Sequence, residues 1–178
     1  MRRSAPRLLA VLALALSLAA CGGDEPAGSA AGSSTAQTCR SSAATAAPGD
    51  VSTDLAEAPA VPTTDDAPPC DLQISDVVVG TGAEAVAGSA VAVKYVGAFY
   101  GTGEEFDSSW SRGDDETLPV TLGSGGVIEG FDQGITGMHV GGRRMVVIPS
   151  DLGYGPAGQG PIPGGATLVF VIDLVSVG

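Results

Sequence analysis

The residues that could carry chemistry are few, and most of them lie in the second half of the chain. Asp107 directly follows Phe106 in the stretch GEEFDSSWSRGDD, so a carboxylate stands beside an aromatic ring. His139 is the only histidine and lies in GMHVGG, a sequence typical of a turn. A zinc site requires four protein ligands, or three and a water, and one histidine without neighbouring thiols cannot supply them. We therefore expect no metal and a surface role for His139.

Hydrolase, nucleotide and nucleic-acid chemistry are also poorly supported. No G-x-S-x-G motif accompanies the histidine, as a serine hydrolase of that type would require. The glycine clusters GSGG and GQGPIPGG lack the Lys and Ser/Thr of a phosphate-binding loop. The chain has 8 basic and 20 acidic side chains, whereas nucleic-acid-binding proteins carry clustered basic residues. The sequence therefore predicts no cofactor and no nucleic-acid partner.

What remains is an apolar, aromatic set with few polar groups. All eight aromatic residues lie between Tyr95 and Phe170. Such a set more often forms plain core than a cavity lining, and Asp107 alone would more often cap a turn through Ser108 and Ser109. The set comprises Tyr95, Phe106, Asp107, Val127, Ile128, Phe131, Tyr154, Ile162 and Phe170.

Strands and one short helix must position these side chains. Apolar residues alternate over 91–96, 118–122 and 168–174, which is typical of strands, and 72–80 and 143–149 are further predicted strands.

The segment GVIEGFDQGITGM has helical spacing instead, because Ile128, Phe131 and Ile135 recur at i, i+3 and i+7. Its three internal glycines each cost about 1 kcal/mol against alanine, so packing must stabilise the helix. Several strands around one helix, without βαβ alternation, predict an α+β unit built on an antiparallel sheet.

Four blocks of the chain resemble, in order, the motifs of FKBP-type peptidyl-prolyl cis/trans isomerases. They are VKYVGAFYGTGEEFDSS, LGSGGVIEGFDQGITGMHVGGRR, IPSDLGYG and IPGGATLVFVIDLV, and the resemblance covers about residues 71–177. It implies an FKBP-like α+β fold in which a bent antiparallel β-sheet, a half-barrel, wraps around one short α-helix. It also implies an enzyme that rotates X-Pro bonds without a cofactor, and binding of macrolide inhibitors.

The resemblance implies a role for each member of the aromatic set. Asp107, Tyr154 and Tyr95 would be catalytic, and Phe131 would form the pocket floor, where the family usually has Trp. Arg112 stands where some members carry an arginine that pairs with the carboxylate. The implied substrate-binding residues are Tyr95, Phe106, Asp107, Leu118, Val127, Ile128, Phe131, Tyr154, Ile162 and Phe170.

Departures from the family pattern concern the rim of this pocket. Leu118 replaces a common aromatic wall residue, and the segment 110–117 is about two residues longer than usual. Trp110, in that longer segment, is either a substrate contact or a cover for the core. These differences affect specificity more than reaction type.

The first twenty residues, MRRSAPRLLAVLALALSLAA, are typical of a secretory signal, with three arginines before an apolar run. Thirteen apolar residues are fewer than a membrane span needs, which disfavours an uncleaved membrane helix. The run ends in Leu-Ala-Ala-Cys21, which resembles the lipobox of bacterial lipoproteins. We therefore expect a lipoprotein signal peptide over 1–20 and lipidation of Cys21.

Residues 21–70 have few larger aliphatics, no aromatic residue and many Ala, Ser, Pro and acids, so we expect a disordered tether there and an isomerase domain over 71–178. Cys39 and Cys70 form an even pair in an exported protein and suggest a disulfide, although two isolated thiols are the alternative. Because such a bridge would close a disordered loop, we expect it to contribute little to domain stability.

Together these observations predict a monomeric, membrane-anchored prolyl isomerase that acts outside the cytoplasm on Pro-containing and unfolded exported proteins. Two other functions are compatible with the sequence. An FKBP-like module could bind Pro-containing segments as a noncatalytic chaperone, or a lipoprotein could deliver a small solute. About 108 folded residues provide no interdomain cleft, which disfavours the solute carrier.

Overall fold

The computed structural model describes residues 39, 49 and 51–178. Its elements are β1 (Gln73–Val78), β2 (Ala90–Phe99), β3 (Glu105–Ser108), η1 (Trp110–Arg112), β4 (Leu118–Thr121), α1 (Glu129–Ile135), β5 (Arg143–Ile148), η2 (Ser150–Leu152) and β6 (Leu168–Val177). Here η denotes a single turn of 3₁₀-helix.

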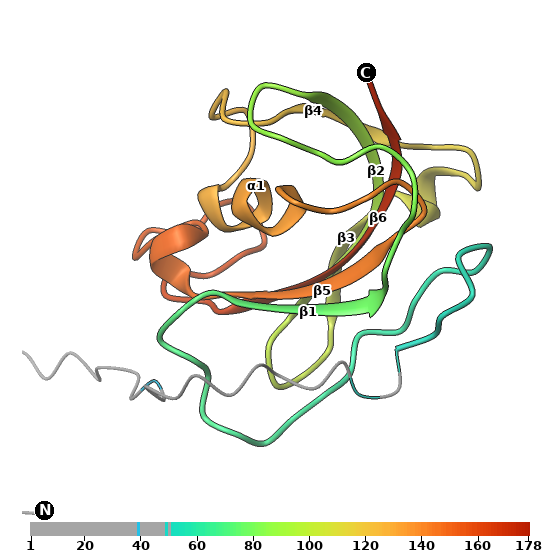
Figure 1. The fold of residues 1–178 in the computed structure, drawn as a ribbon. Helices are drawn as coiled ribbons and strands as arrows, with labels where there is room; N and C mark the ends of the chain where they lie inside the picture. The colour runs from blue at the N-terminus through green and yellow to red at the C-terminus, as the bar shows by residue number, and fades with distance from the viewer. Residues whose placement is uncertain (1–38, 40–48, 50) are drawn as a thin grey trace, which may run out of the picture. The chain divides into compact units, whose positions relative to one another are not determined.

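The six strands form one antiparallel sheet in the order β1-β5-β6-β2-β3. Both β4 and β3 pair with β2: β4 with its first half and β3 with its second. The sheet curves around α1, which lies against its concave face (Figure 1). This confirms the predicted α+β fold with a bent antiparallel sheet around one short helix.

Helix α1 packs closely on β5 because two of its residues have no side chain. Gly130 faces Ile148, and a Cβ on Gly134 would lie only 2.8 Å from Val146 Cγ2. Phe131 and Ile135 point into the core and are 3% and 0% exposed. The glycines that weaken the helix locally therefore permit the packing that stabilises it.

The main core lies between α1 and the concave face of the sheet. It joins alternate residues of the long strands to the helix, as the period of two predicts. Its buried strand residues include Val91, Val93, Tyr95, Val146, Ile148, Leu168, Phe170, Ile172 and Leu174.

The convex face of the sheet is also covered, by residues 51–70, which corrects the expectation of a disordered tether up to residue 70. Val51 is 7% exposed and packs in a second apolar cluster with Met145, Val147, Val169 and Val171. Val61 packs against the same cluster. We call residues 51–70 the strap.

Arg143 holds the strap against the domain. Arg143 is fully buried, and its Nε and Nη2 donate to the two oxygens of Asp173 at 2.6 and 2.7 Å. The remaining guanidinium N–H groups donate to the carbonyls of Ser52, Asp54 and Glu57. Buried charges are tolerated when they are paired and fully hydrogen-bonded. The strap carbonyls therefore complete the hydrogen bonding of the Arg143 guanidinium.

Cys39 and Cys70 form a disulfide. It joins the end of the strap to a residue 31 positions earlier in the chain. The adjoining Pro69 is fully buried, so this end of the strap is fixed on the domain.

The predicted signal peptide and Cys21 lie outside the described residues. Within the described part of the chain, no helix has the length and apolar character needed to cross a bilayer.

Candidate active site

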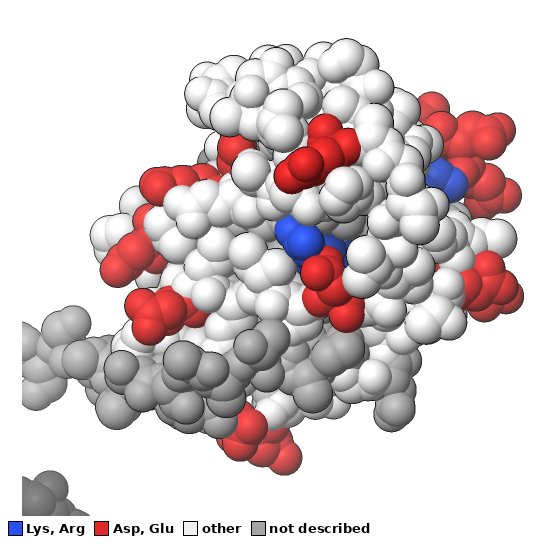
Figure 2. Space-filling model, in the orientation of Figure 1, with Lys and Arg blue, Asp and Glu red and all other residues white. Residues whose placement is uncertain are grey.

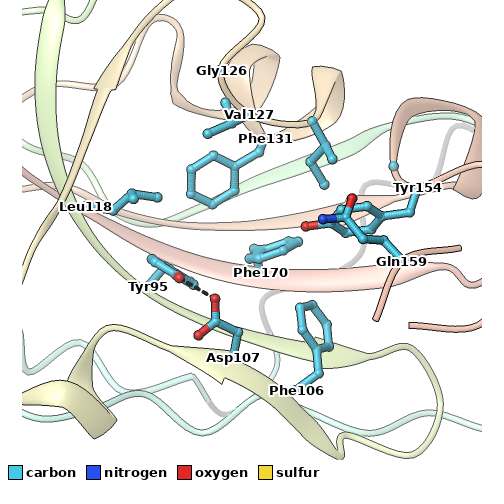
Figure 3. A pocket seen from close by; sticks show the side chains of 12 residues that line it. Tyr95, Phe106, Asp107, Leu118, Gly126, Val127, Phe131, Tyr154, Gln159 and Phe170 are labelled. Carbon is cyan, nitrogen blue, oxygen red and sulfur yellow. Dashed lines mark hydrogen bonds between the residues drawn. The ribbon is translucent and has the colours of Figure 1, made fainter. Parts of the chain in front are cut away.

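A cavity of about 520 Å³ opens between α1, the concave face of the sheet and the loop that follows η2 (Figure 3). This volume falls in the range typical of small-ligand sites. Its lining residues are Tyr95, Phe106, Asp107, Leu118, Gly126, Val127, Ile128, Phe131, Gly153, Tyr154, Gln159 and Phe170.

Four aromatic rings pack against one another in the apolar part of the cavity, and Phe170 lies at their centre. The ring centroids of Phe131, Phe106 and Tyr95 lie 5.1, 5.6 and 6.1 Å from that of Phe170. Phe131 and Phe106 meet it edge to face, which is a favoured arrangement of aromatic pairs. The rings are therefore packed against one another and still border open space.

Gly97 on β2 makes room for two of these rings. A Cβ at this position would lie 2.7 Å from Phe170 Cε1 and 2.9 Å from Phe106 Cζ. The strand register also shifts between Gly97 and Ala98, where β2 pairs with β3. A side chain here would push both rings toward the cavity, so glycine sets the cavity's depth.

Asp107 and Tyr95 form the polar edge of the cavity together with Arg112. Tyr95 Oη donates to Asp107 Oδ2 at 2.5 Å, and Arg112 Nη1 donates to Asp107 Oδ1 at 2.7 Å. Arg112 Nη2 also donates to Tyr95 Oη at 3.0 Å. The Asp107 side chain is 48% exposed, so its charge lies at the mouth of the cavity and not at its floor.

The backbone of β2 and the end of β3 fix the positions of Tyr95, Asp107 and Arg112. Ser109 is fully buried, and its amide donates to the Tyr95 carbonyl while its hydroxyl accepts from the Tyr95 amide. The Ser108 hydroxyl accepts from the Trp110 amide, where η1 begins. The two serines thus shape the turn, and the Asp107 carboxylate bonds to Tyr95 and Arg112.

Burial and the contacts among Tyr95, Asp107 and Arg112 shift the pKa values of Tyr95 and Asp107. Partial burial alone would raise the pKa of Asp107, but the hydrogen bonds from Tyr95 and Arg112 and the Arg112 charge lower it below its usual value. Burial, followed by the hydrogen bond to Asp107, raises the pKa of Tyr95. At neutral pH the site therefore contains a carboxylate ion and a neutral phenol.

Tyr154 and Gln159 face the cavity from the loop between β5 and β6 (Figure 3). Burial, and then the nearby charge of Asp107, raises the pKa of Tyr154, so its hydroxyl keeps its proton. Within the described part of the chain this hydroxyl has no hydrogen-bond partner. It can therefore donate to a bound carbonyl.

The structure brings nearly all of the sequence-predicted site residues together around one opening. The exception is Ile162, which is 7% exposed, belongs to the main core and does not line the cavity. Sequence reasoning missed Gly126, Gly153 and Gln159. The two glycines directly precede predicted site residues, and that adjacency was the available signal.

Trp110 does not line the cavity. Lys94 Nζ lies 3.9 Å from the centroid of its ring and donates to the Asp114 carbonyl, so the lengthened segment folds back on β2. Trp110 Nε1 is buried without a hydrogen-bond partner in the described structure. Trp110 is therefore not a contact of the cavity, and its ring lies against Lys94 of β2.

The described residues contain no cluster of His, Cys, Asp or Glu that could bind a metal ion. His139 lies in the turn after α1, and its Nδ1 is 3.0 Å from the Gly82 carbonyl.

Residues 82–175 match the family model of the FKBP-type peptidyl-prolyl cis-trans isomerases. The chain is 54% identical over 112 residues to an FK506-binding protein of Streptomyces anulatus, covering 62% of this chain and 89% of that protein. It is also 54% identical over 108 residues to a probable FK506-binding protein of Corynebacterium glutamicum, covering 61% and 88%.

Solved structures of the same kind resemble this one. The crystal structure of AtFKBP13 matches with a TM-score of 0.55 and 38% identity, covering 60% of this chain and 93% of that one. A peptidyl-prolyl cis-trans isomerase from Pseudomonas syringae matches with a TM-score of 0.52 and 34% identity, covering 60% and 74%.

Proposed function

The chain belongs to the family of FKBP-type peptidyl-prolyl cis-trans isomerases, and we propose that it rotates X-Pro bonds of exported polypeptides while anchored to a membrane. The observation that carries the proposed mechanism is the aromatic cavity around Phe170, whose one charged lining residue, Asp107, lies at the mouth.

The cavity favours the twisted imide over the planar one. Cis and trans X-Pro bonds differ by only about 0.5–1 kcal/mol, but a barrier of about 18–20 kcal/mol separates them. At the top of the barrier the C–N resonance is broken and the carbonyl oxygen carries less negative charge. Water stabilises the more dipolar planar form, and a cavity walled by Phe106, Phe131 and Phe170 withdraws that stabilisation.

The polar groups of the site orient the substrate and leave the floor apolar. The free hydroxyl of Tyr154 donates to a substrate carbonyl. Asp107, held by Tyr95 and Arg112, faces the carbonyl carbon of the rotating imide from the cavity mouth. A tenfold acceleration requires only about 1.4 kcal/mol of preferential transition-state binding, which two hydrogen bonds and ring packing can supply.

Exchange spectroscopy on a Leu-Pro peptide tests this function. Catalytic amounts of the chain should accelerate cis-to-trans exchange, which takes roughly 10–100 s without a catalyst. Asp107→Val should reduce the acceleration, whereas Asp71→Asn, an exposed acid outside the cavity, should not. Peptide binding with unchanged exchange rates would leave the noncatalytic chaperone function instead.

Export and anchoring rest on the first 21 residues. The apolar run before Cys21 supports a lipoprotein signal, and lipidation at that cysteine would place the domain outside the cytoplasm on a membrane. The clients would then be Pro-containing and unfolded exported proteins, met by a monomeric enzyme. Several relatives are named FK506-binding proteins, which supports macrolide binding at the same cavity.

A fatty-acid label tests the anchor directly. Cells that express the chain should incorporate labelled fatty acid into it, and Cys21→Ser should abolish the label. Label that remains on the Cys21→Ser chain would contradict this anchor without affecting the isomerase assignment.

A further inference from the structure

The strand that carries Phe106 and Asp107 has little support from the sheet itself. β3 is an edge strand of four residues, and β2 is its one partner among the described strands. Glu105 and Asp107 pair with consecutive residues of β2, so Phe106 between them has no paired residue. A bulge of this kind redirects a side chain but interrupts the ladder. The position of Phe106 therefore depends on its packing and on the β2–β3 turn, residues 100–104, that leads into β3.

The β2–β3 turn is coupled to the cavity wall through Phe99, the last residue of β2. The ring centroid of Phe106 lies 5.2 Å from that of Phe99 and 5.6 Å from that of Phe170. The Phe99 amide donates to the Glu104 carbonyl at 3.0 Å, and the Gly103 amide donates to the Phe99 carbonyl at 2.9 Å. A displacement of the turn would therefore move Phe99 and the start of β3 together.

The strap lies directly against this turn, which it passes below the sheet (Figure 1). A Cβ on Gly103 would lie 2.7 Å from Thr63 Cγ2 and 3.5 Å from the Val61 carbonyl oxygen. A Cβ on Gly101 would lie 3.5 Å from the Thr64 carbonyl oxygen. The two glycines thus let the strap and the turn approach closely, backbone against backbone.

The strap is itself held by the rest of the domain. Val51 is buried in the apolar cluster on the convex face of the sheet, and Val61 and Tyr100 both pack against that cluster. Arg143 donates to three carbonyls of the strap segment that follows Val51. The strap also lies outside the residues that match the family model, 82–175. It is therefore a support that this chain adds beside the matching region.

We propose that the strap positions the active site: Val61 and Thr63 fix the β2–β3 turn and thereby hold Phe106 and Asp107 in place at the cavity. Val61 and Thr63 do not line the cavity, so they act through the turn and are positioning residues. This inference deepens the proposed function and rests on it for the reaction that Phe106 and Asp107 serve.

Two valine substitutions in the strap test this role. Val61→Ala and Val51→Ala both remove two methyl groups from the same apolar cluster, but only Val61 lies against the β2–β3 turn. Neither changes the charge of a surface on which acidic side chains are widely spread (Figure 2). With both chains fully folded, we expect Val61→Ala to lower kcat/KM for the Leu-Pro peptide about three- to fivefold, because small displacements of catalytic groups cost rate. Val51→Ala should leave kcat/KM unchanged.

Two further readouts separate positioning from loss of stability. The amide shifts of Phe106 and Asp107 should change in Val61→Ala and not in Val51→Ala. The pH–rate profile of Val61→Ala should also fall at a higher pH, because a displaced β3 weakens the hydrogen bond from Tyr95 to Asp107 and so lowers the pKa of Asp107 less.

A pair of substitutions at the contact itself provides a rescue test. Gly103→Ala places a methyl group 2.7 Å from Thr63 Cγ2 and should displace the turn and lower kcat/KM. Thr63→Ser removes Cγ2, so adding it to Gly103→Ala should recover most of the loss. The positive φ of Gly103 strains alanine equally in both chains and does not affect this comparison.

Equal kcat/KM values for Val61→Ala and Val51→Ala, whether lowered or unchanged, would overturn the positioning role of the strap. So would a Gly103→Ala chain whose loss Thr63→Ser does not relieve. If the wild-type chain does not isomerise the peptide, the proposed function fails separately. The amide shifts then decide alone, and unchanged shifts of Phe106 and Asp107 in Val61→Ala would contradict the positioning role.

Discussion

Asp107 owes its charge state to two neighbours, and this gives the site a distinctive pH dependence. Because hydrogen bonds from Tyr95 and Arg112 lower its pKa in the folded chain, the carboxylate stabilises the fold above the unfolded value of 3.8. That contribution is lost as the pH falls through the lower folded value. We expect kcat/KM to show no ionisation of Asp107 between about pH 7 and pH 5, and a fall only below about pH 4.

A pH–rate profile on the Leu-Pro peptide checks this expectation. Arg112→Gln removes one donor and the positive charge, so its profile should fall at a higher pH than that of the wild type. A wild-type fall centred near pH 6, or identical profiles for the two chains, would show that the pair does not set the charge of Asp107.

Tyr154 should contribute to rate and little to stability. Its hydroxyl has no partner in the described part of the chain, so Tyr154→Phe leaves no protein group unsatisfied. Loss of one hydrogen bond to the substrate should lower kcat/KM about five- to tenfold, with the free energy of unfolding unchanged within about 0.5 kcal/mol. Kinetics and urea unfolding on the same preparation check both parts, and full activity of the variant would contradict this role.

At the residue scale, family motifs predicted more of the site than spacing did. Periodicity alone favoured a plain core for the aromatic residues and a turn cap for Asp107. Ile162 was assigned to the pocket by motif position, but its loop turns the side chain into the core. Gln159 was not predicted, because exposed polar residues on glycine-rich loops have no periodicity that would reveal their direction.

At the scale of elements, replacing a glycine of α1 sets a gain in helix propensity against overpacking of the core. Gly134→Ala gains about 1 kcal/mol of helix propensity, but its Cβ would lie 2.8 Å from Val146 Cγ2. Overpacking of a close-packed core typically costs about 1–3 kcal/mol, so we expect a net loss of up to about 2 kcal/mol. Urea unfolding measures it, with Gln133→Ala on the exposed side of α1 as the control. A more stable Gly134→Ala chain would show that α1 does not need this close approach.

Strand positions were predictable from two patterns, alternation and short apolar runs, even where both faces are buried, as in β5 and β6. Alternation revealed β2, β4 and β6, and apolar runs revealed β1 and β5. The short strand β3 was missed, because Glu105 and Asp107 give it a charged, unpatterned sequence. It forms through pairing with β2 and the buried hydroxyls of Ser108 and Ser109, which are tertiary effects.

At the scale of the whole molecule, the strap changes where the folded unit begins. The composition of the strap predicts disorder. In the structure, however, Val51 packs into an apolar patch on the convex face, and strap carbonyls accept hydrogen bonds from the Arg143 guanidinium. Neither partner is visible in the local sequence, because Arg143 and the residues of the patch all lie more than eighty residues further along the chain.

Because the strap packs on the domain, we now expect the disulfide to contribute to the stability of the fold. The bridge spans 31 residues, and folding orders the strap inside that loop. In the entropic account such a bridge contributes roughly 3–4 kcal/mol, so Cys39→Ser should lower the free energy of unfolding by about 2–4 kcal/mol. Chemical denaturation with and without reductant measures this in the wild type. An unchanged midpoint after reduction would indicate that the strap is held without the bridge.

The most direct test of the account is a comparison of two substitutions at Val127 on the cavity wall. Val127→Thr changes polarity at nearly constant volume, and Val127→Ala changes volume without adding a polar group. If exclusion of water from the imide drives catalysis, kcat/KM for the Leu-Pro peptide should fall about tenfold in the Thr variant and only about twofold in the Ala variant. Equal or better activity of the Thr variant would contradict a mechanism based on an apolar cavity.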